Sequence, residues 1–504
     1  MRLNKKNYLQ LTKQSSFIIT ISGLVSKILA AIYRIPYQNL VGDRGFFAYQ
    51  QIYPLLAIIT TLSLTALPNV VASLSQTTEK KQLGHLFQLQ LLVSAALSFV
   101  LIVCHQWLAN SIGSPALAPA IIISGLVLLT VPFTSFYRGL AQADDNMVPT
   151  AVSQVLEQTI RIAIIIAAAL CYYCFHWTIY LTANVAAAGN VMASVVILLY
   201  FYFTSPYSLS SYFHQKFVPS QVLKKLGLSS FVYIFYALYL LLFQLIDALV
   251  IKNSLIAKGM SEALAETTKG IYDRGQPLLQ FGLIFSTALF TSFLPQLTRY
   301  YAVNSDVYRT ESQSFFTFIY YFNVTLTAGF LAILPLMNVV LFKDNRGWLA
   351  LSCYVIIISL ASLIQFFHQQ LFIEQHSVVS LLFLTIGLGL KIMLTVPMTM
   401  QWSIVGSALA TVLPLLIVLG LYAYYCKIDF KSLANGKFYV ILVIMVLTVT
   451  SLARLLPHVG RMSSFITLLI VTLSGLALFV ALAIFLRVFP QKLWSYLPIN
   501  TKKW

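Results

Sequence analysis

Two cations lie seven residues apart in an apolar segment near the start of the chain. The segment SKILAAIYRIPYQNLVGDRG holds Lys27 and Arg34 inside a stretch, 15–40, that is long enough to cross a bilayer. Seven residues make nearly two helical turns, so both side chains project from one face of a helix. A cation at the bilayer centre costs roughly 2.5–3.5 kcal/mol, and such residues usually face a bundle interior or an aqueous cavity. We therefore predict that Lys27 and Arg34 face a cavity.

Other charges also fall within apolar stretches. The cations are Arg138, Arg161, Lys391 and Arg454, and the acids are Glu157 and Asp247. Glu157 precedes Arg161 by four residues, the spacing of a helical ion pair. Arg138 either binds substrate or marks the cytoplasmic end of its span. Asp247 is a candidate proton or sodium site or an ion-pair partner. Lys27 and Arg34 also have alternative roles: they could pair with Glu157 or Asp247, or extend to opposite membrane interfaces.

A cavity that carries several cations and few acids suits a substrate with an anionic head. Cations recover part of their desolvation cost by pairing with phosphate, and arginine binds phosphate through a bidentate fork. The chain carries no phosphate-binding glycine loop, no nucleophile motif in context and no cluster of His or Cys ligands. We therefore expect a transporter that is not an enzyme and uses neither a cofactor nor a metal.

The composition requires a membrane to position these residues. The 504 residues are 59% hydrophobic and 9% charged, with a mean hydropathy of +0.83, which is typical of a polytopic all-α membrane protein. Apolar windows predict about fourteen transmembrane helices. Lys and Arg concentrate in alternate loops, which places both termini in the cytoplasm. This loop bias also accounts for the net charge of +18, so the charge does not indicate nucleic-acid binding. The longest outer loop, 252–272, is expected to be a short amphipathic or partly ordered segment.

An internal repeat organises the spans. Asp43-Arg44-Gly45 recurs 230 residues later as Asp273-Arg274-Gly275, and at the same offset Phe136-Tyr137-Arg138 matches Phe366-Phe367-His368 and Arg161 matches Lys391. A shift of six helices keeps the orientation, so we predict two six-helix lobes related by a parallel pseudo-twofold repeat. The predicted parts are an N-terminal lobe (1–204), a cytoplasmic linker (205–223), a C-terminal lobe (224–430), and two further spans with a cytoplasmic tail (431–504).

Three stretches resemble one family. SGLVSKILAAIYRIPYQNLVGDRGFFAYQQIYPLL, PFTSFYRGLAQADDNMVPTAVSQVLEQTIRI and GIYDRGQPLLQFGL are similar to the first, fourth to fifth and eighth helices of the lipid II flippases (MurJ-like) and of related Gram-positive polysaccharide and spore-cortex flippases. These belong to the multidrug/oligosaccharidyl-lipid/polysaccharide exporter superfamily. The resemblance covers 15–300 well and the remainder mainly by topology.

The resemblance implies translocation of undecaprenyl-pyrophosphate-linked peptidoglycan precursor (lipid II) to the outer leaflet by alternating access. By motif match, the family's cavity residues carry over to Lys27, Arg34, Asp43 and Arg274. Lys27 stands where the family often has arginine, and a family arginine near the end of the second helix has no counterpart in TALPNVVASLSQ. Together with the residues singled out above, the predicted substrate-binding residues are Lys27, Arg34, Asp43, Arg138, Arg161, Asp273, Arg274 and Lys391.

The expected partners are a lipid-linked anionic glycan with a pyrophosphate head, membrane lipids and cell-wall synthesis enzymes, in a bacterial plasma membrane. The last two spans would form a groove for the lipid tail, with Arg454 at its edge. The alternatives are export of another lipid-linked oligosaccharide, for capsule or teichoic-type polymers, and cation-coupled multidrug antiport. A drug antiporter should expose acids to cationic drugs, whereas this chain places more cations than acids in its spans.

Overall fold

The computed structural model describes residues 25, 28–29, 31–76, 80–213, 219–428, 433–457 and 460–489. All regular structure in these ranges is helical, which confirms the predicted all-α class. Twelve helical stretches in the described part of the chain are long and apolar enough to cross a membrane.

The number differs from the predicted fourteen for two reasons. Half of the first predicted span, with Lys27, lies outside the described residues, and its end runs into the second span across Gly42, where φ is 70° and the helix breaks. The predicted eleventh and twelfth spans form one continuous stretch, interrupted only by non-helical backbone at Trp402 and Ser403. The predicted divisions between these spans therefore lie at or beside the breaks at Gly42 and at Trp402 and Ser403, across which each helical stretch continues.

The chain divides into two compact units. The first unit comprises Met1–Asp273 together with Leu388–Ser403, and the second comprises Arg274–Gly387 and Ile404–Trp504. The lobe and linker boundaries predicted above stay a prediction; the described part of the linker already contains a short helix, α9, and the start of another, α10.

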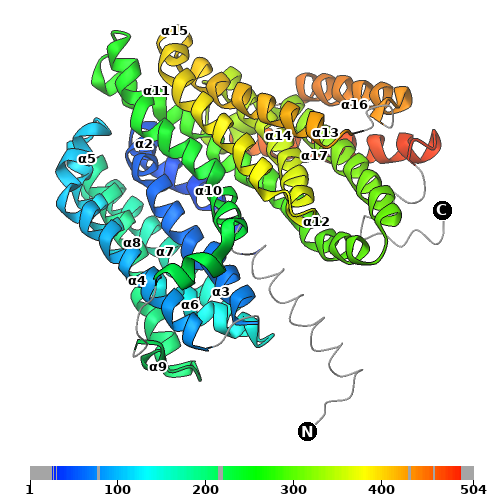
Figure 1. The fold of residues 1–504 in the computed structure, drawn as a ribbon. Coiled ribbons are helices and arrows are strands. Elements are labelled where there is room, and N and C mark those ends of the chain that lie inside the picture. Colours follow the sequence, from blue (N-terminus) through cyan, green and yellow to red (C-terminus); the bar gives the residue numbers. More distant parts are fainter. Residues whose placement is uncertain are drawn as a thin grey trace. The chain divides into compact units, whose positions relative to one another are not determined.

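The first unit contains the following helices, in chain order: α2 (Arg34–Thr61), a π-helical turn η1 (Leu62–Ala66), α3 (Leu67–Ser75), α4 (Lys80–Val103), α5 (His105–Ser111), a 3-10 turn η2 (Pro115–Leu117), α6 (Ala118–Ala143), α7 (Val148–Phe175), α8 (Ile179–Thr204), α9 (Ser210–Phe213), α10 (Pro219–Ala257) and α11 (Glu262–Asp273). The middle of α15 (Ser377–Tyr425), from Leu388 to Ser403, also belongs to this unit. The helix α2 packs against α7, α8, α10 and α11 (Figure 1).

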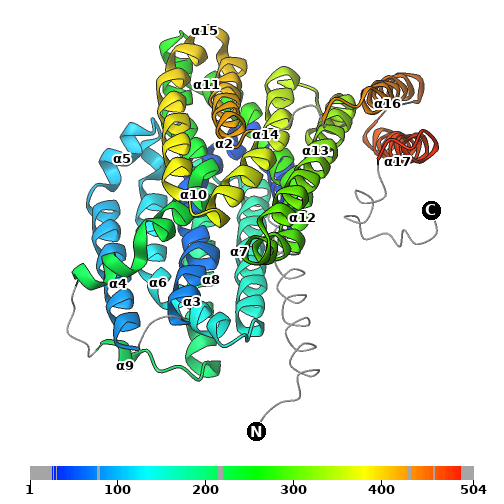
Figure 2. The same ribbon diagram turned by 45° about the vertical axis from the view of Figure 1, so that its right-hand side comes forward.

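The second unit holds the remaining helices: α12 (Gly275–Val303), α13 (Ser305–Phe342), α14 (Trp348–Ile373), the rest of α15, α16 (Gly436–Leu455) and α17 (Arg461–Phe485). The helices α12, α13 and α14 pack against one another, while α16 and α17 form a pair that packs on α13 (Figure 2). Large apolar side chains on α16 and α17, such as Val443, Leu447, Leu469 and Leu473, are exposed, as expected of helices that face lipid.

The helix boundaries support the sequence repeat. The helices α6 and α14 each span 26 residues, and both their first and their last residues are 230 positions apart. The first Asp-Arg-Gly motif directly follows the break at Gly42 in α2, and the second contains the boundary between α11 and α12, at Arg274. The matched residues Arg138 and His368 are both buried. Equal boundaries and equal burial are what a duplicated pair of helices would retain.

The predicted loop 252–272 is largely helical. It contains the end of α10 and most of α11, whose buried face includes Ala265, Glu266, Lys269 and Gly270. A Cβ atom added to Gly270 would lie 2.0 Å from the carbonyl oxygen of Asp43 in α2, which is far inside van der Waals contact. Glycine at this position therefore allows the backbones of α11 and α2 to approach closely.

Replacing Gly270 by alanine is expected to lower the thermal-unfolding midpoint of the purified protein, because neither backbone can move away without repacking α2. A loss of roughly 1–3 kcal/mol is typical of such overpacking. The matched control is Gly389→Ala in the same unit, where an added Cβ meets no atom within 4 Å; its midpoint should stay the same or rise slightly. Equal midpoints for both variants would show that the close approach contributes nothing to stability.

Candidate functional site

A fully buried guanidinium lies at the start of α2. The Arg34 side chain has 0% exposure, and none of its three nitrogens has a hydrogen-bond partner among the described residues. Its neighbours are aromatic: the guanidinium carbon is 4.1 Å from the ring centroid of Tyr53 and 5.8 Å from that of Tyr33. Cation–π contact compensates only part of the cost of burying a charge. Arg34 is therefore free to bind an anion.

Four tyrosines of this region come from the turn before α2 and from α2 itself. The hydroxyls of Tyr33 and Tyr49 are 3.4 Å apart, and the rings of Tyr37 and Tyr53 both lie against Tyr49, with centroids 5.3 and 6.2 Å away. The Tyr37 hydroxyl is buried without a hydrogen-bond partner among the described residues. The sequence analysis missed these residues, although their helical spacing, with pairs four residues apart, was visible in the sequence.

A second arginine reaches the same tyrosines from α7. Arg161 is 4% exposed and lies close enough to Tyr33, Tyr49 and Tyr53 to interact with them electrostatically, as Arg34 does. Its Nη2 donates to the amide oxygen of Gln158, while its Nε has no partner in the described part of the chain. We call Arg34, Arg161, Tyr33, Tyr49 and Tyr53 the arginine–tyrosine cluster.

The expected pairing of Glu157 with Arg161 is wrong. Arg138 donates instead to Glu157, from Nη2 at 2.8 Å, and also to the side chains of Ser63 at 2.8 Å and Ser153 at 3.0 Å. Arg138 has 0% exposure and lies five residues before the end of α6. Helical spacing allowed the Glu157–Arg161 pair, but α6 packs beside α7 and presents a cation with better geometry.

Lys391 and Asp247 neutralise each other. The Lys391 ammonium lies 2.5 Å from Asp247 Oδ1, and the Tyr272 hydroxyl donates to Oδ2 at 2.7 Å. Lys391 has 0% exposure and Asp247 3%, so this is a buried ion pair within the first unit. Of the roles open to Asp247, the structure shows the ion pair. Lys391 therefore has no unpaired charge to offer a substrate in this conformation.

The residues of the two Asp-Arg-Gly motifs each have protein partners. Asp273 pairs with Lys269 at 2.5 Å, and Asp43 accepts from the Gln38 amide at 2.9 Å; both carboxylates are buried. The charge of Asp273 also interacts with those of Arg34 and Asp247. Asp273 and Arg34 therefore lie within electrostatic range of each other in the first unit.

An outer network follows the first motif. Glu266 of α11, 1% exposed, accepts from Arg44 at 2.5 Å and from Lys252 at 3.0 Å, and the Tyr180 hydroxyl donates to it as well. These contacts join α2, α8, α10 and α11. Because Glu266 neutralises both cations, the network is better suited to holding these helices together than to binding an anion.

In the second unit, Arg274 is held by an acid of the α13–α14 connection. Its Nη1 and Nη2 donate to the two carboxylate oxygens of Asp344, at 2.7 and 3.1 Å. Asp344 also accepts from Arg346. Partial burial alone would raise the pKa of the Asp344 carboxyl, but the hydrogen bonds from Arg274 and Arg346 outweigh it and hold that pKa well below its usual range.

This shift predicts a pH dependence. A carboxyl with a depressed pKa in the folded protein stabilises it above the unfolded-state pKa, about 3.9 for aspartate, and loses that contribution as the pH falls through the folded-state value. The difference in thermal-unfolding midpoint between wild type and Asp344→Asn should therefore be constant from about pH 8 to 5 and shrink below about pH 4. A difference that changes between pH 8 and 6 would contradict the Arg274–Asp344 pairing in solution.

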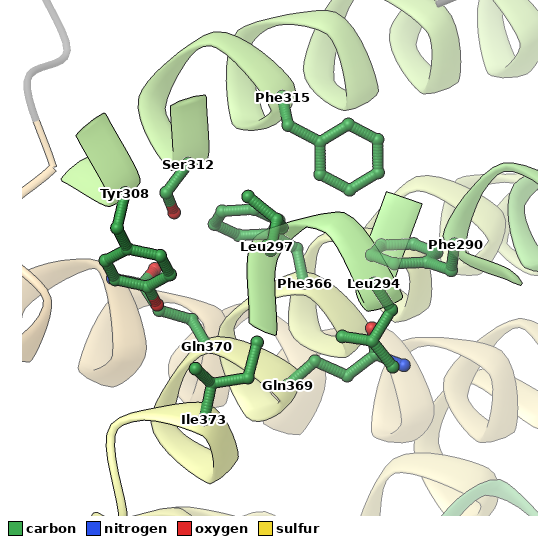
Figure 3. Close-up of a pocket in the computed structure, with 10 residues that line it drawn as sticks. All are labelled: Phe290, Leu294, Leu297, Tyr308, Ser312, Phe315, Phe366, Gln369, Gln370 and Ile373. Atoms are coloured by element: carbon green, nitrogen blue, oxygen red, sulfur yellow. The ribbon is translucent and has the colours of Figure 1, made fainter. Parts of the chain in front are cut away.

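A small pocket lies elsewhere in the second unit, between α12, α13 and α14 (Figure 3). Its lining is mainly apolar, with the hydroxyls of Tyr308 and Ser312 and the amides of Gln369 and Gln370. None of the predicted charged site residues lines it. Over the described residues, no three His, Cys, Asp or Glu side chains gather in an arrangement that could hold a metal ion.

Comparison with known proteins supports this architecture. The family described as "Polysaccharide biosynthesis protein" matches residues 12–301. The chain is 30% identical over 426 residues to "Uncharacterized membrane protein YabM" of Bacillus subtilis, covering 82% of this chain and 80% of that protein. It is 27% identical over 172 residues to the lipid II flippase MurJ of Bacillus subtilis, covering 31% of this chain and 32% of that protein.

Solved structures show the same fold. A lipid II flippase MurJ in an inward closed conformation has a TM-score of 0.67 at 14% identity, covering 95% of this chain and 99% of that chain. An inward-facing multidrug resistance MATE family transporter of the MOP superfamily has a TM-score of 0.59 at 11% identity, covering 83% of this chain and 98% of that chain. The two-lobed arrangement of these proteins is therefore the fold of this chain, which confirms the predicted architecture.

Proposed function

Because the chain belongs to the polysaccharide biosynthesis protein family, we propose that it is a flippase that moves the undecaprenyl-pyrophosphate-linked peptidoglycan precursor, lipid II, from the inner to the outer leaflet. The similarity to two proteins named lipid II flippase MurJ, one in sequence and one in fold, supports this choice of substrate. Alternating access would carry the head group across, driven by membrane potential or by consumption of the product rather than by ATP.

One observation carries the proposal: the arginine–tyrosine cluster holds two buried arginines whose charges no carboxylate pairs within the described residues. Two guanidinium groups match the charge of a pyrophosphate diester, and their planar forks suit its oxygens. The surrounding tyrosines provide hydroxyls and aromatic faces. Arg34 and Arg161 are accordingly the proposed binding residues, ahead of Arg138 and Lys391, whose charges Glu157 and Asp247 neutralise.

Asp43, Asp273 and Arg274 are proposed as further functional residues through the family resemblance. In the first unit, Asp273 acts electrostatically on Arg34, and its partner Lys269 balances its charge, so Asp43 and Asp273 would position cations rather than bind the anionic head. Arg274, a residue of the second unit, is proposed separately as a cation that meets the substrate. Lys27 belongs to the same proposal by its spacing from Arg34, and it lies outside the described residues.

A second candidate substrate is another lipid-linked oligosaccharide. The family description names polysaccharide biosynthesis, and the chain is 26% identical over 193 residues to stage V sporulation protein B of Bacillus subtilis, covering 36% of each chain. The arginine–tyrosine cluster would bind the pyrophosphate of either substrate. Multidrug antiport is less well supported, since the buried acids Glu157, Asp247 and Asp273 are each paired with a cation.

Complementation tests the proposal. The resident lipid II flippase of a bacterium is depleted, this chain is expressed, and lipid II on the outer surface is labelled. Restored labelling is the expected result. No restoration by a chain that is shown to be inserted in the membrane would overturn lipid II as the substrate and favour another lipid-linked glycan.

A further inference from the structure

The two proposed substrate cations are in different states. Arg34 has no hydrogen-bond partner in the part of the chain that the structure describes, whereas Arg274 is bound at both terminal nitrogens by Asp344. A carboxylate on a guanidinium fork has the same planar, bidentate geometry that a phosphate adopts there. Asp344 therefore occupies the face of Arg274 that an anionic ligand would use. This inference rests on the proposed function, because it needs Arg274 to meet an anion.

The Arg274–Asp344 pair joins a buried cation to a partly exposed carboxylate. The Arg274 side chain is 1% exposed but that of Asp344 is 31% exposed, so the carboxylate is the solvated partner. Water reaches the pair from the side of Asp344 and weakens the attraction between the two charges. The Phe342 ring, with its centroid 5.3 Å from the guanidinium carbon, already covers part of Arg274. A purely structural role would be met by a neutral acceptor.

The connection between α13 and α14 is built to hold the carboxylate in place. Lys343 and Gly347, on either side of it, both have positive φ, at 72° and 73°. The amide of Asn338, which is 0% exposed, donates to the Arg346 carbonyl at 3.2 Å and to the Asn345 side chain at 3.3 Å. The turn is thereby fixed to α13, and Asp344 is presented to Arg274 without a mobile segment.

Arg346 gives Asp344 a second partner. Its Nε and Nη2 donate to Asp344 Oδ2 at 3.0 and 2.8 Å, and its backbone N–H donates to Oδ1 at 2.9 Å. Arg346 is 58% exposed. If Arg274 were taken by another anion, Asp344 would still be paired. The three side chains together carry one net positive charge, which attracts an anion to the site.

We infer that Asp344 occupies the position on Arg274 that the anionic head of the substrate would take. It neutralises Arg274 while no substrate is bound, and a diphosphate displaces it, so that Asp344 then pairs with Arg346 alone. A diphosphate carries more negative charge than one carboxylate and competes for the same fork. The pair lowers the affinity of Arg274 for the substrate, because each binding event must break the contact between Asp344 and Arg274. Asp344 is on this account a specificity-determining residue, selecting ligands with more charge than a single carboxylate.

Binding of farnesyl diphosphate, a short polyprenyl diphosphate, to the purified full chain in detergent tests the inference by calorimetry. Asp344→Asn should bind this probe about tenfold tighter, since a hydrogen-bonded charge no longer competes. The gain should disappear when Arg274→Gln is added. The control is Asp306→Asn, which removes one negative charge from an exposed position in the first turn of α13 and should leave the affinity unchanged.

A second variant tests the same idea with the opposite sign. Arg346→Gln removes the second partner of Asp344, so the carboxylate should hold Arg274 more firmly and the probe should bind several-fold more weakly. In the Asp344→Asn background the same change should have little effect. This variant leaves the Arg274–Asp344 pair intact, so it is informative even if Asp344→Asn does not fold.

The outcomes separate the two proposals. If the wild type binds the probe and Arg34→Met loses binding, the proposed anion site stands; unchanged or weaker binding by Asp344→Asn, or an unchanged affinity of Arg346→Gln, would then overturn only the role of Asp344. If the wild type does not bind the probe and Arg34→Met does not change complementation, the proposed function itself fails.

Discussion

Arg34→Met is expected to abolish transport while leaving the protein as stable as the wild type or more stable. The wild-type guanidinium is buried without a hydrogen-bond partner in the described residues, so folding bears its desolvation cost with little return. Methionine has a similar length and removes that cost. If Arg34 binds the anionic head, its loss should reduce the rate of lipid II exposure roughly 100-fold, as expected for a buried charge that loses its partner. Outer-surface labelling and the thermal-unfolding midpoint measure the two effects.

The matched control is Arg138→Met. Arg138 is equally buried, but Glu157, Ser63 and Ser153 satisfy it. Its removal leaves Glu157 charged and buried, and breaking such a pair typically costs about 3–5 kcal/mol. The two substitutions should therefore differ in their effect on stability. Arg34→Met should keep the stability and lose transport, whereas Arg138→Met should lower the stability. A large fall in the midpoint of Arg34→Met would show that Arg34 has a structural partner.

The second large effect concerns Lys391 and Asp247. Asp247→Asn or Lys391→Met alone should lower the free energy of unfolding by about 3–5 kcal/mol, because each leaves one buried charge without its partner. The double variant Asp247→Asn/Lys391→Met should recover most of that loss, since no charge is left uncompensated. Midpoints of the four proteins form a double-mutant cycle whose interaction energy reports the coupling of the pair.

Transport by the same four proteins gives a separate measurement. If the pair only holds α10 against the middle of α15, the double variant should transport nearly as well as the wild type once it is folded. Effects of the two single substitutions that simply add would contradict the ion pair. A stable double variant that no longer transports would assign Asp247 a further role, as the proton or ion site that the sequence left open.

Much of the fold followed from apolar length alone. Segments of about twenty apolar residues had to be helices, because a bilayer offers backbone groups no hydrogen-bond partner outside the segment. The repeat also appeared in the sequence, and the equal boundaries of α6 and α14 support it. The sequence divided the spans near Gly42 and near Trp402 and Ser403, but it did not show that helix continues on both sides of each break, because hydropathy does not report the backbone angles of one or two residues.

The sequence by itself determined which charges are placed within the membrane, since each of them is unfavourable there unless it is used or paired. Only the tertiary structure decided which of those two conditions holds for each residue. Glu157 could pair with Arg161 along its own helix, yet α6 supplied Arg138 instead. Lys391 and Asp247, 144 residues apart in the chain, neutralise each other. Among the described residues of the first unit, Arg34 and Arg161 lie among tyrosines without a carboxylate in contact. Pairing depends on distances between helices, which the order of residues along one helix does not specify.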